Sequence, residues 1–145
     1  MVIQTKYHGE IEVHENEIIQ FQSGLPGFLE EKQFVLLTID KESPFLILQS
    51  IQTEELGFVV VNPFLFIRDY GFKLSEGEKE ILKIETESDI QIYSILTIKE
   101  PFEESTANLQ GPIILNGVKQ IAKQVILSHS PYTTRHKLFA ETTIK

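Results

Sequence analysis

The chain has 145 residues, a size typical of one domain, and no Pro/Ser-rich or low-complexity stretch divides it, so we expect a single domain over residues 1–145. Its net charge of −8 argues against direct binding of RNA or DNA, because nucleic-acid binding needs clustered cations to neutralise phosphates. The absence of cysteine excludes disulfides, thiolate zinc sites and a cysteine nucleophile, and it fits a reducing compartment.

The N-terminal residues alternate apolar and polar and break at Gly9, so they lack the continuous apolar core of a secretory signal. No window approaches the run of about 18 apolar residues that a membrane span needs. We therefore expect a cytoplasmic protein without membrane contact. The acidic balance has two readings: it confers solubility alone, or it attracts a basic partner.

Short β-branched and aromatic runs dominate the first half of the chain and are separated by turn residues such as Gly9, Gly57 and the Asn62–Pro63 pair. Their spacing is close to the roughly 8 to 12 residues typical of sandwiches and barrels. We expect an all-β, barrel-like antiparallel domain. The predicted strands are residues 2–7, 10–13, 18–22, 34–39, 45–51 and 58–61.

The segment from Phe64 to Tyr70 is rich in aromatic residues and ends before a turn at Gly71. As a strand, it would place Phe64 and Phe66 on one face and Leu65 and Ile67 on the other. Either one face stays exposed and marks a protein-binding surface, or both faces are buried in a closed barrel.

Aromatic residues are enriched in binding hot spots, and an Arg-Asp pair lies between the aromatic residues of this segment. We therefore predict that the segment contributes to a partner-binding surface, with an aromatic anchor and with Asp69 facing a cationic group of the partner. The predicted partner-binding residues are Phe64, Phe66, Arg68, Asp69 and Tyr70.

One short helix is expected after Ser75, because Ser75 and Glu78 have the spacing of a capping box and Ile81 and Leu82 follow as core-facing candidates. Residues 90–98 then alternate as a strand that is rich in isoleucine and leucine, which predicts a central position in the sheet.

Residues 118–126 fit two patterns. Their apolar positions match a helical stripe, but Asn116–Gly117 is a strong hairpin signal and most of the stripe residues are β-branched. We interpret the segment as a strand.

The chain contains no Walker loop, dinucleotide fingerprint, nucleophile elbow or His-Glu-x-x-His motif. Residues 24–27, Gly-Leu-Pro-Gly, are glycine-rich, but the proline removes a backbone donor and no lysine follows, so they predict a rigid turn. The four histidines have no recognised ligand spacing and are expected at the surface: His8, His14, His129 and His136. We predict no catalytic residue, metal or cofactor.

Several motifs, in this order, resemble the FliW family over nearly the whole chain. They are Phe-Gln-Ser-Gly-Leu-Pro-Gly-Phe at 21–28, Ser-Pro-Phe at 43–45 with Leu-Gln-Ser at 48–50, Asn-Pro-Phe at 62–64 with Asp-Tyr at 69–70, Ala-Asn-Leu-Gln-Gly-Pro-Ile at 107–113, Gln-Val-Ile-Leu at 124–127, and Tyr132 with Arg135–His136. Two departures are Asn62, where Asp-Pro is common, and Gly111, where Lys-Ala or a similar pair often precedes the proline.

The resemblance implies an all-β, catalytically inert protein that regulates flagellum assembly through two protein partners. One is CsrA, an RNA-binding repressor of flagellin translation, and the other is flagellin. Free flagellin would occupy the protein, and secretion of flagellin would release it to bind CsrA and relieve repression. An acidic antagonist would be steered toward the cations of an RNA-binding protein and would repel the competing RNA.

Two other functions stay open at this stage. The first is a barrel that encloses a small apolar ligand. The second is an OB-type RNA-binding barrel, which the net charge and the lack of interleaved cations and aromatic residues disfavour.

Overall fold

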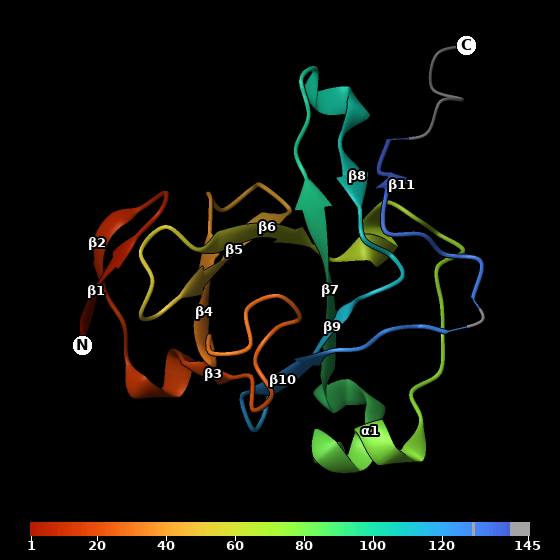
Figure 1. The fold of residues 1–145 in the computed structure, drawn as a ribbon, viewed down its shortest axis with the longest axis horizontal. Helices are drawn as coiled ribbons and strands as arrows, with labels where there is room; N and C mark the ends of the chain where they lie inside the picture. The colour runs from red at the N-terminus through yellow and green to blue at the C-terminus, as the bar shows by residue number, and fades with distance from the viewer. Residues whose placement is uncertain (129, 140–145) are drawn as a thin grey trace.

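The structure, a computed structural model, describes residues 1–128 and 130–139 and contains a closed β-barrel (Figure 1). Going round the barrel, β7 is followed by β6, β5, β4, β3, β10 and β9, and β9 pairs again with β7. The strands are β3 (Ile19–Gln20), β4 (Gln33–Thr38), β5 (Phe45–Ser50), β6 (Gly57–Val61), β7 (Ile90–Thr97), β9 (Ile113–Asn116) and β10 (Ile121–Gln124). The all-β barrel prediction is confirmed.

All neighbouring pairs of the barrel are antiparallel except β3 and β10, which run parallel with Ile121 beside Gln20. The expected antiparallel arrangement thus holds for every neighbouring pair of the barrel except this one. The reason is topological: strand direction cannot alternate all the way round a closed ring with an odd number of strands, so one pair must be parallel.

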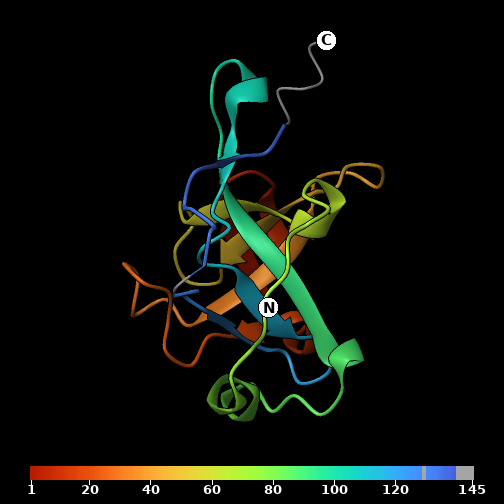
Figure 2. The same cartoon turned by 90° about the vertical axis from the view of Figure 1, so that its right-hand side faces the viewer.

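Four further strands lie outside the barrel. β1 (Val2–Thr5) and β2 (Gly9–Glu12) form a separate two-stranded ribbon, and β8 (Thr106–Ala107) and β11 (His136–Lys137) extend the sheet beyond the end of β7. Figure 2 shows the long diagonal of β7 and the hairpin that projects above it. β7 pairs with β9, β6 and β8 along its length, which confirms its predicted central position.

The helix and hairpin signals predicted local structure well. α1 (Glu76–Ile81) is N-capped by Ser75, whose Oγ accepts the Glu78 amide at 3.2 Å. Leu82 is buried, but Ile81 is 49% exposed, so its predicted core position was wrong: a helix of six residues presents only one face to the protein. Residues 118–120 form the turn that leads into β10, and the strand interpretation of 118–126 holds for Ile121–Gln124.

Short 3₁₀ helices connect the strands among the described residues: η1 (Glu15–Glu17), η2 (Pro63–Leu65), η3 (Glu87–Asp89) and η4 (Phe102–Glu104). In the first half of the chain, the bounds of most predicted strands differ by one residue from those in the structure, but two strands are clearly shorter than predicted, β1 and β3. Residues 18–22 shrink to Ile19–Gln20 because the amide of Gly24 turns back to the carbonyl of Phe21 at 2.8 Å. His129 and residues 142–145 lie outside the described residues.

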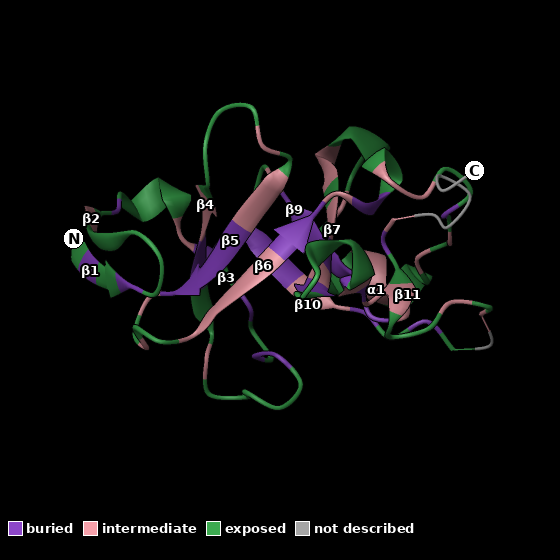
Figure 3. Cartoon of the chain, turned by 90° about the horizontal axis from the view of Figure 1, so that it is seen from above, coloured by how far each residue is buried: buried purple, intermediate pink, exposed green. Residues whose placement is uncertain are grey.

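Buried residues concentrate on β5 and β9 (Figure 3). The interior is filled by a cluster that includes Phe21, Phe34 and Leu48. A second apolar cluster lies outside the barrel, where α1 and the segment before it cover β7 and β9 through Leu82 and Ile114.

Gln49 is fully buried and joins three parts of the fold. Its Oε1 accepts the backbone N–H of Lys6 at 2.9 Å, which attaches the β1–β2 ribbon to the barrel. Its Nε2 lies 3.1 to 3.2 Å from four carbonyl oxygens, those of Ser50, Thr53, Glu54 and Leu56. A buried amide with these partners fixes the loop after β5 against the barrel.

Candidate partner-binding surface

The segment after β6 turns away from the sheet instead of continuing it. Asn62 caps η2, and its Oδ1 accepts the backbone N–H of Phe64 at 2.9 Å. Pro63 has no N–H to donate to a strand ladder and favours the first position of a helical turn. The strand reading of residues 64–67, with Phe64 and Phe66 on one face, was therefore wrong.

The turn divides the five predicted residues into an exposed set and a packed set. Phe64 is 41% exposed, and its neighbour Leu65 is 65% exposed. Arg68 and Asp69 are exposed, Phe66 is half-buried, and Tyr70 is only 4% exposed. We name the exposed predicted residues together with their neighbour Leu65 the η2 patch, which therefore consists of Phe64, Leu65, Arg68 and Asp69.

Tyr70 holds the η2 patch against the rest of the protein. Its hydroxyl donates a hydrogen bond to the carbonyl of Leu109 at 2.8 Å, and its ring centre lies 4.7 Å from that of Tyr132. The Tyr132 hydroxyl accepts the backbone N–H of Gly71 at 3.0 Å. Burial, followed by the nearby Tyr132, raises the pKa of Tyr70, so its phenol stays protonated and keeps donating.

Phe66 belongs to a ring of four phenylalanines from distant parts of the chain. It lies 5.8 Å from both Phe45 and Phe139, and Phe102 closes the ring at 5.6 Å from Phe45 and 5.4 Å from Phe139. Phe102 is 41% exposed, so this cluster reaches the surface beside the patch. We did not predict Phe102, because no local pattern connects it with residues 64–70.

The charged residues of the η2 patch are available to a partner. The ion pairs of the described residues join Lys79 to Glu76, Lys119 to Glu85 and Lys123 to Glu78, and none involves Arg68 or Asp69. The patch thus combines exposed apolar carbon with an unpaired cation and an unpaired carboxylate. Such a combination suits a protein partner, with apolar contact for affinity and charge for steering.

In the part of the chain that the structure describes, the barrel interior leaves little room for a small ligand. The barrel interior contains a space of only about 10 Å³ among residues such as Phe21, Leu48 and Tyr93. Ligand pockets are commonly about 300 Å³ or larger. Residues 1–128 and 130–139 contain no group of three or more His, Asp or Glu side chains that could hold a metal ion.

Comparison with known proteins connects the chain to one family. The family model described as FliW protein matches residues 2–138. A flagellar assembly factor FliW of Bacillus licheniformis is 52% identical over 141 residues, which cover 97% of this chain and 99% of the relative. A flagellar assembly factor FliW of Geobacillus kaustophilus is 50% identical over the full length of both chains.

A solved structure agrees with the sequence comparison. The crystal structure of the flagellar assembly factor FliW superposes with a TM-score of 0.94 at 51% sequence identity, and it covers 97% of this chain and 99% of that one.

In the described residues, no helix is both long and apolar enough to cross a membrane.

Proposed function

The chain belongs to the FliW family, and on this premise we propose that it is a flagellar assembly factor that acts by binding proteins. The observation that carries the proposal is the match to flagellar assembly factors at about half identity over nearly the full length. The η2 patch supports it, because the patch offers exposed apolar carbon and charges that take part in none of the ion pairs of the described residues.

The two proposed partners are CsrA and flagellin, which the family resemblance implies. Flagellin would occupy the protein while it accumulates, and its secretion would release the protein to bind CsrA and relieve repression of flagellin translation. The net charge of −8 supports the CsrA step, since an acidic surface is attracted to an RNA-binding protein and repels RNA. The acidic protein need not cover the RNA site, because like charge beside that site also weakens RNA binding.

The proposed mechanism requires neither catalysis nor a cofactor, and the proposed compartment is the cytoplasm, where translation takes place. A broad panel of hydrolase, transferase and oxidoreductase substrates tests the non-enzymatic part. We expect no saturable turnover. Turnover that disappears when a single polar residue is changed would overturn this part of the proposal.

The binding part is tested by calorimetric titration of the whole chain with purified CsrA and with flagellin, followed by a mobility-shift assay on the flagellin leader RNA. We expect each protein to bind, and we expect the chain to lower the affinity of CsrA for RNA without shifting RNA itself. Failure to bind either protein would refute the proposal. So would micromolar or tighter binding of the chain alone to the RNA at physiological salt.

A further inference from the structure

One edge of β7 has no strand beside it over part of its length. Residues 90–93 pair with β9 on one edge, whereas β6 meets the other edge only at Ser94 and Ile95. β6 stops there because Asn62 and Pro63 begin η2. Within the described residues, the edge of β7 that faces away from β9 is therefore open at residues 90–93.

The backbone hydrogen bonds show which peptide groups face the open edge. The carbonyl of Asp89 accepts the Gly117 amide at 2.9 Å, and the carbonyl of Ile95 accepts the Asn108 amide at 2.9 Å. The peptide groups of the odd-numbered residues therefore face β9 and the chain leading into it. Because successive residues of a strand present their peptide groups to opposite edges, the N–H and C=O groups of Ile90 and Ile92 face the open edge.

Of the peptide N–H and C=O groups of Ile90 and Ile92, only one already has a backbone hydrogen bond to another described residue. The Ile90 amide donates to the carbonyl of Glu87 as η3 ends. The carbonyl of Ile90 and both peptide groups of Ile92 have no backbone partner among the described residues. An acceptor, a donor and a second acceptor thus stand in a row, which is the pattern that an added strand pairs with.

The open edge forms one wall of a groove of about 620 Å³. The opposite wall is the extended segment with Phe72 and Leu74, which descends from η2 to α1 (Figure 2). The side chains of Ile90 and Ile92 line the groove and are half-buried, as are Phe72 and Leu74. The groove therefore offers unsatisfied backbone groups and incompletely buried apolar side chains at the same place.

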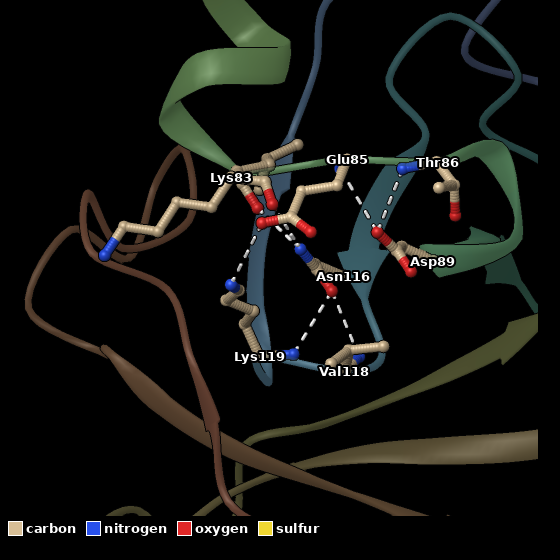
Figure 4. A network of polar contacts seen from close by, with 8 residues as sticks. Lys83, Glu85, Thr86, Asp89, Asn116, Val118 and Lys119 are labelled. Atoms are coloured by element: carbon tan, nitrogen blue, oxygen red, sulfur yellow. Dashed lines mark hydrogen bonds and ion pairs between the residues drawn. The ribbon is translucent and has the colours of Figure 1, made fainter.

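The end of the groove at residues 84–87 is fixed by two polar side chains (Figure 4). Asn116 is fully buried, and its Nδ2 donates to the carbonyls of Leu82 at 2.8 Å and Lys83 at 3.1 Å. Asp89 Oδ2 accepts the amides of Glu85 and Thr86, each at 3.1 Å. A groove held in this way binds without first having to be ordered.

The rim of the groove carries one more carboxylate than lysine, and outside the ion pairs of the described residues it offers one charge of each sign, Glu87 and Lys73. Three carboxylates, Glu76, Glu85 and Glu87, stand against two lysines, Lys73 and Lys79. Glu76 and Lys79 pair with each other at 3.5 Å, and Glu85 pairs with Lys119 at 3.7 Å. Glu87 is exposed and takes part in none of the ion pairs of the described residues, so it is the carboxylate free to meet a cation.

We propose that this groove binds an extended segment of a protein partner, which adds a strand to the open edge of β7. The segment is apolar at alternate positions, where it meets Ile90 and Ile92, and it has a basic residue beside Glu87. Main-chain hydrogen bonds supply affinity in this mode and side-chain contacts supply selectivity. The inference rests on the proposed function, because CsrA and flagellin are the proteins expected to supply the segment.

Amide hydrogen exchange tests the backbone part, with the whole chain alone and with saturating CsrA or flagellin. We expect the Ile92 amide to exchange slowly only when a partner is bound, whereas the Tyr93 amide, which faces β9, is protected in both states. Overlapping peptides of the bound partner should include one that protects Ile92 by itself. If the whole partner binds and Ile92 stays unprotected, the inference is overturned and the proposed function stands. If neither protein binds, both are overturned.

Two matched pairs of variants test the side chains. Leu74→Lys in the groove wall should weaken binding about tenfold or more, while Ile81→Lys, at an exposed position on α1 outside the groove, should change it less than about twofold. Glu87→Lys should weaken binding more than Glu80→Lys, which lies on α1 outside this groove. Equal effects within each pair, measured on variants with unchanged melting temperatures, would contradict the groove as the binding site.

Discussion

The interior of the barrel and the layer outside β7 use similar side chains but bury them to different extents. Inside, the rings of Phe21 and Phe34 pack edge to face with their centres 5.1 Å apart, and a space of only about 10 Å³ remains. Outside, Phe72, Leu74 and their neighbours on β7 are half-buried around a groove of about 620 Å³. A closed barrel completes its interior, whereas the covering layer leaves apolar side chains incompletely buried.

The difference in burial follows from the path of the segment that connects β6 with α1. β6 ends at Val61, just before η2 begins at Pro63, so the covering segment crosses to α1 without pairing to β7. The half-buried residues of this segment, Phe72 and Leu74, are therefore held against β7 by side-chain contacts and not by backbone pairing. Mutations in the interior should lower stability and leave binding intact in the fraction that folds. Mutations in the outer layer should weaken binding and change stability less.

The largest stability effect is expected for Phe34→Ala in the interior. Phe34 is fully buried against Phe21 and Phe58, and the removal of a core phenylalanine costs about 3 to 5 kcal/mol of unfolding free energy. Urea denaturation measures the loss. Phe28→Ala is the control, because Phe28 is 42% exposed although it touches the same Phe58. A loss as small as that of the control would show that the interior is not the main source of stability.

A buried polar change should come next. Gln49→Leu keeps much of the side-chain volume but leaves the Lys6 amide without its acceptor, whereas the carbonyls of Thr53 and Leu56 keep backbone donors. An unsatisfied amide of this kind costs about 1 to 3 kcal/mol. Denaturation reports the energy, and faster hydrogen exchange at Lys6 would locate the loosened β1–β2 ribbon. Gln52→Leu, at an exposed position, should change stability by less than about 0.5 kcal/mol.

Phe66 lies between the two regions and should show an intermediate effect. Because Phe66 is half-buried but contacts Phe45 and Phe139, Phe66→Ala should lower the unfolding free energy by about 2 kcal/mol. Phe64→Ala in the η2 patch should leave stability nearly unchanged and weaken partner binding by about 2 kcal/mol if Phe64 is an anchor. Calorimetric melting and binding titration of both variants separate the roles. The reverse result would move the anchor to Phe66.

The sequence predicted those features whose signals are local. Ser75 and Glu78 placed the helix start, and Asn116–Gly117 placed the hairpin before β10. Proline at position 63 was also a local signal, but we gave more weight to the alternation of residues 64–67, so η2 was missed. Features that depend on three-dimensional closure could not be read from the pattern. Three features depend on closure in this way: the parallel β3–β10 pair, the four-phenylalanine ring with Phe102 and Phe139, and the open edge of β7.

The smallest stability effect and the sharpest kinetic one are expected for Asp69→Lys. Asp69 is exposed and takes part in none of the ion pairs of the described residues, so the change should alter the unfolding free energy by less than about 0.5 kcal/mol. If Asp69 faces a cation of CsrA, the reversed charge should slow association and reduce its dependence on salt, because charge at the rim of an interface acts mainly on the encounter rate. Association rates at low and high salt measure both effects. Glu42→Lys makes the same charge change in an exposed turn of the hairpin between β4 and β5, so it carries the contribution of net charge alone. An equal slowing by both variants would mean that CsrA senses only the overall charge of the protein, and that the η2 patch does not face it.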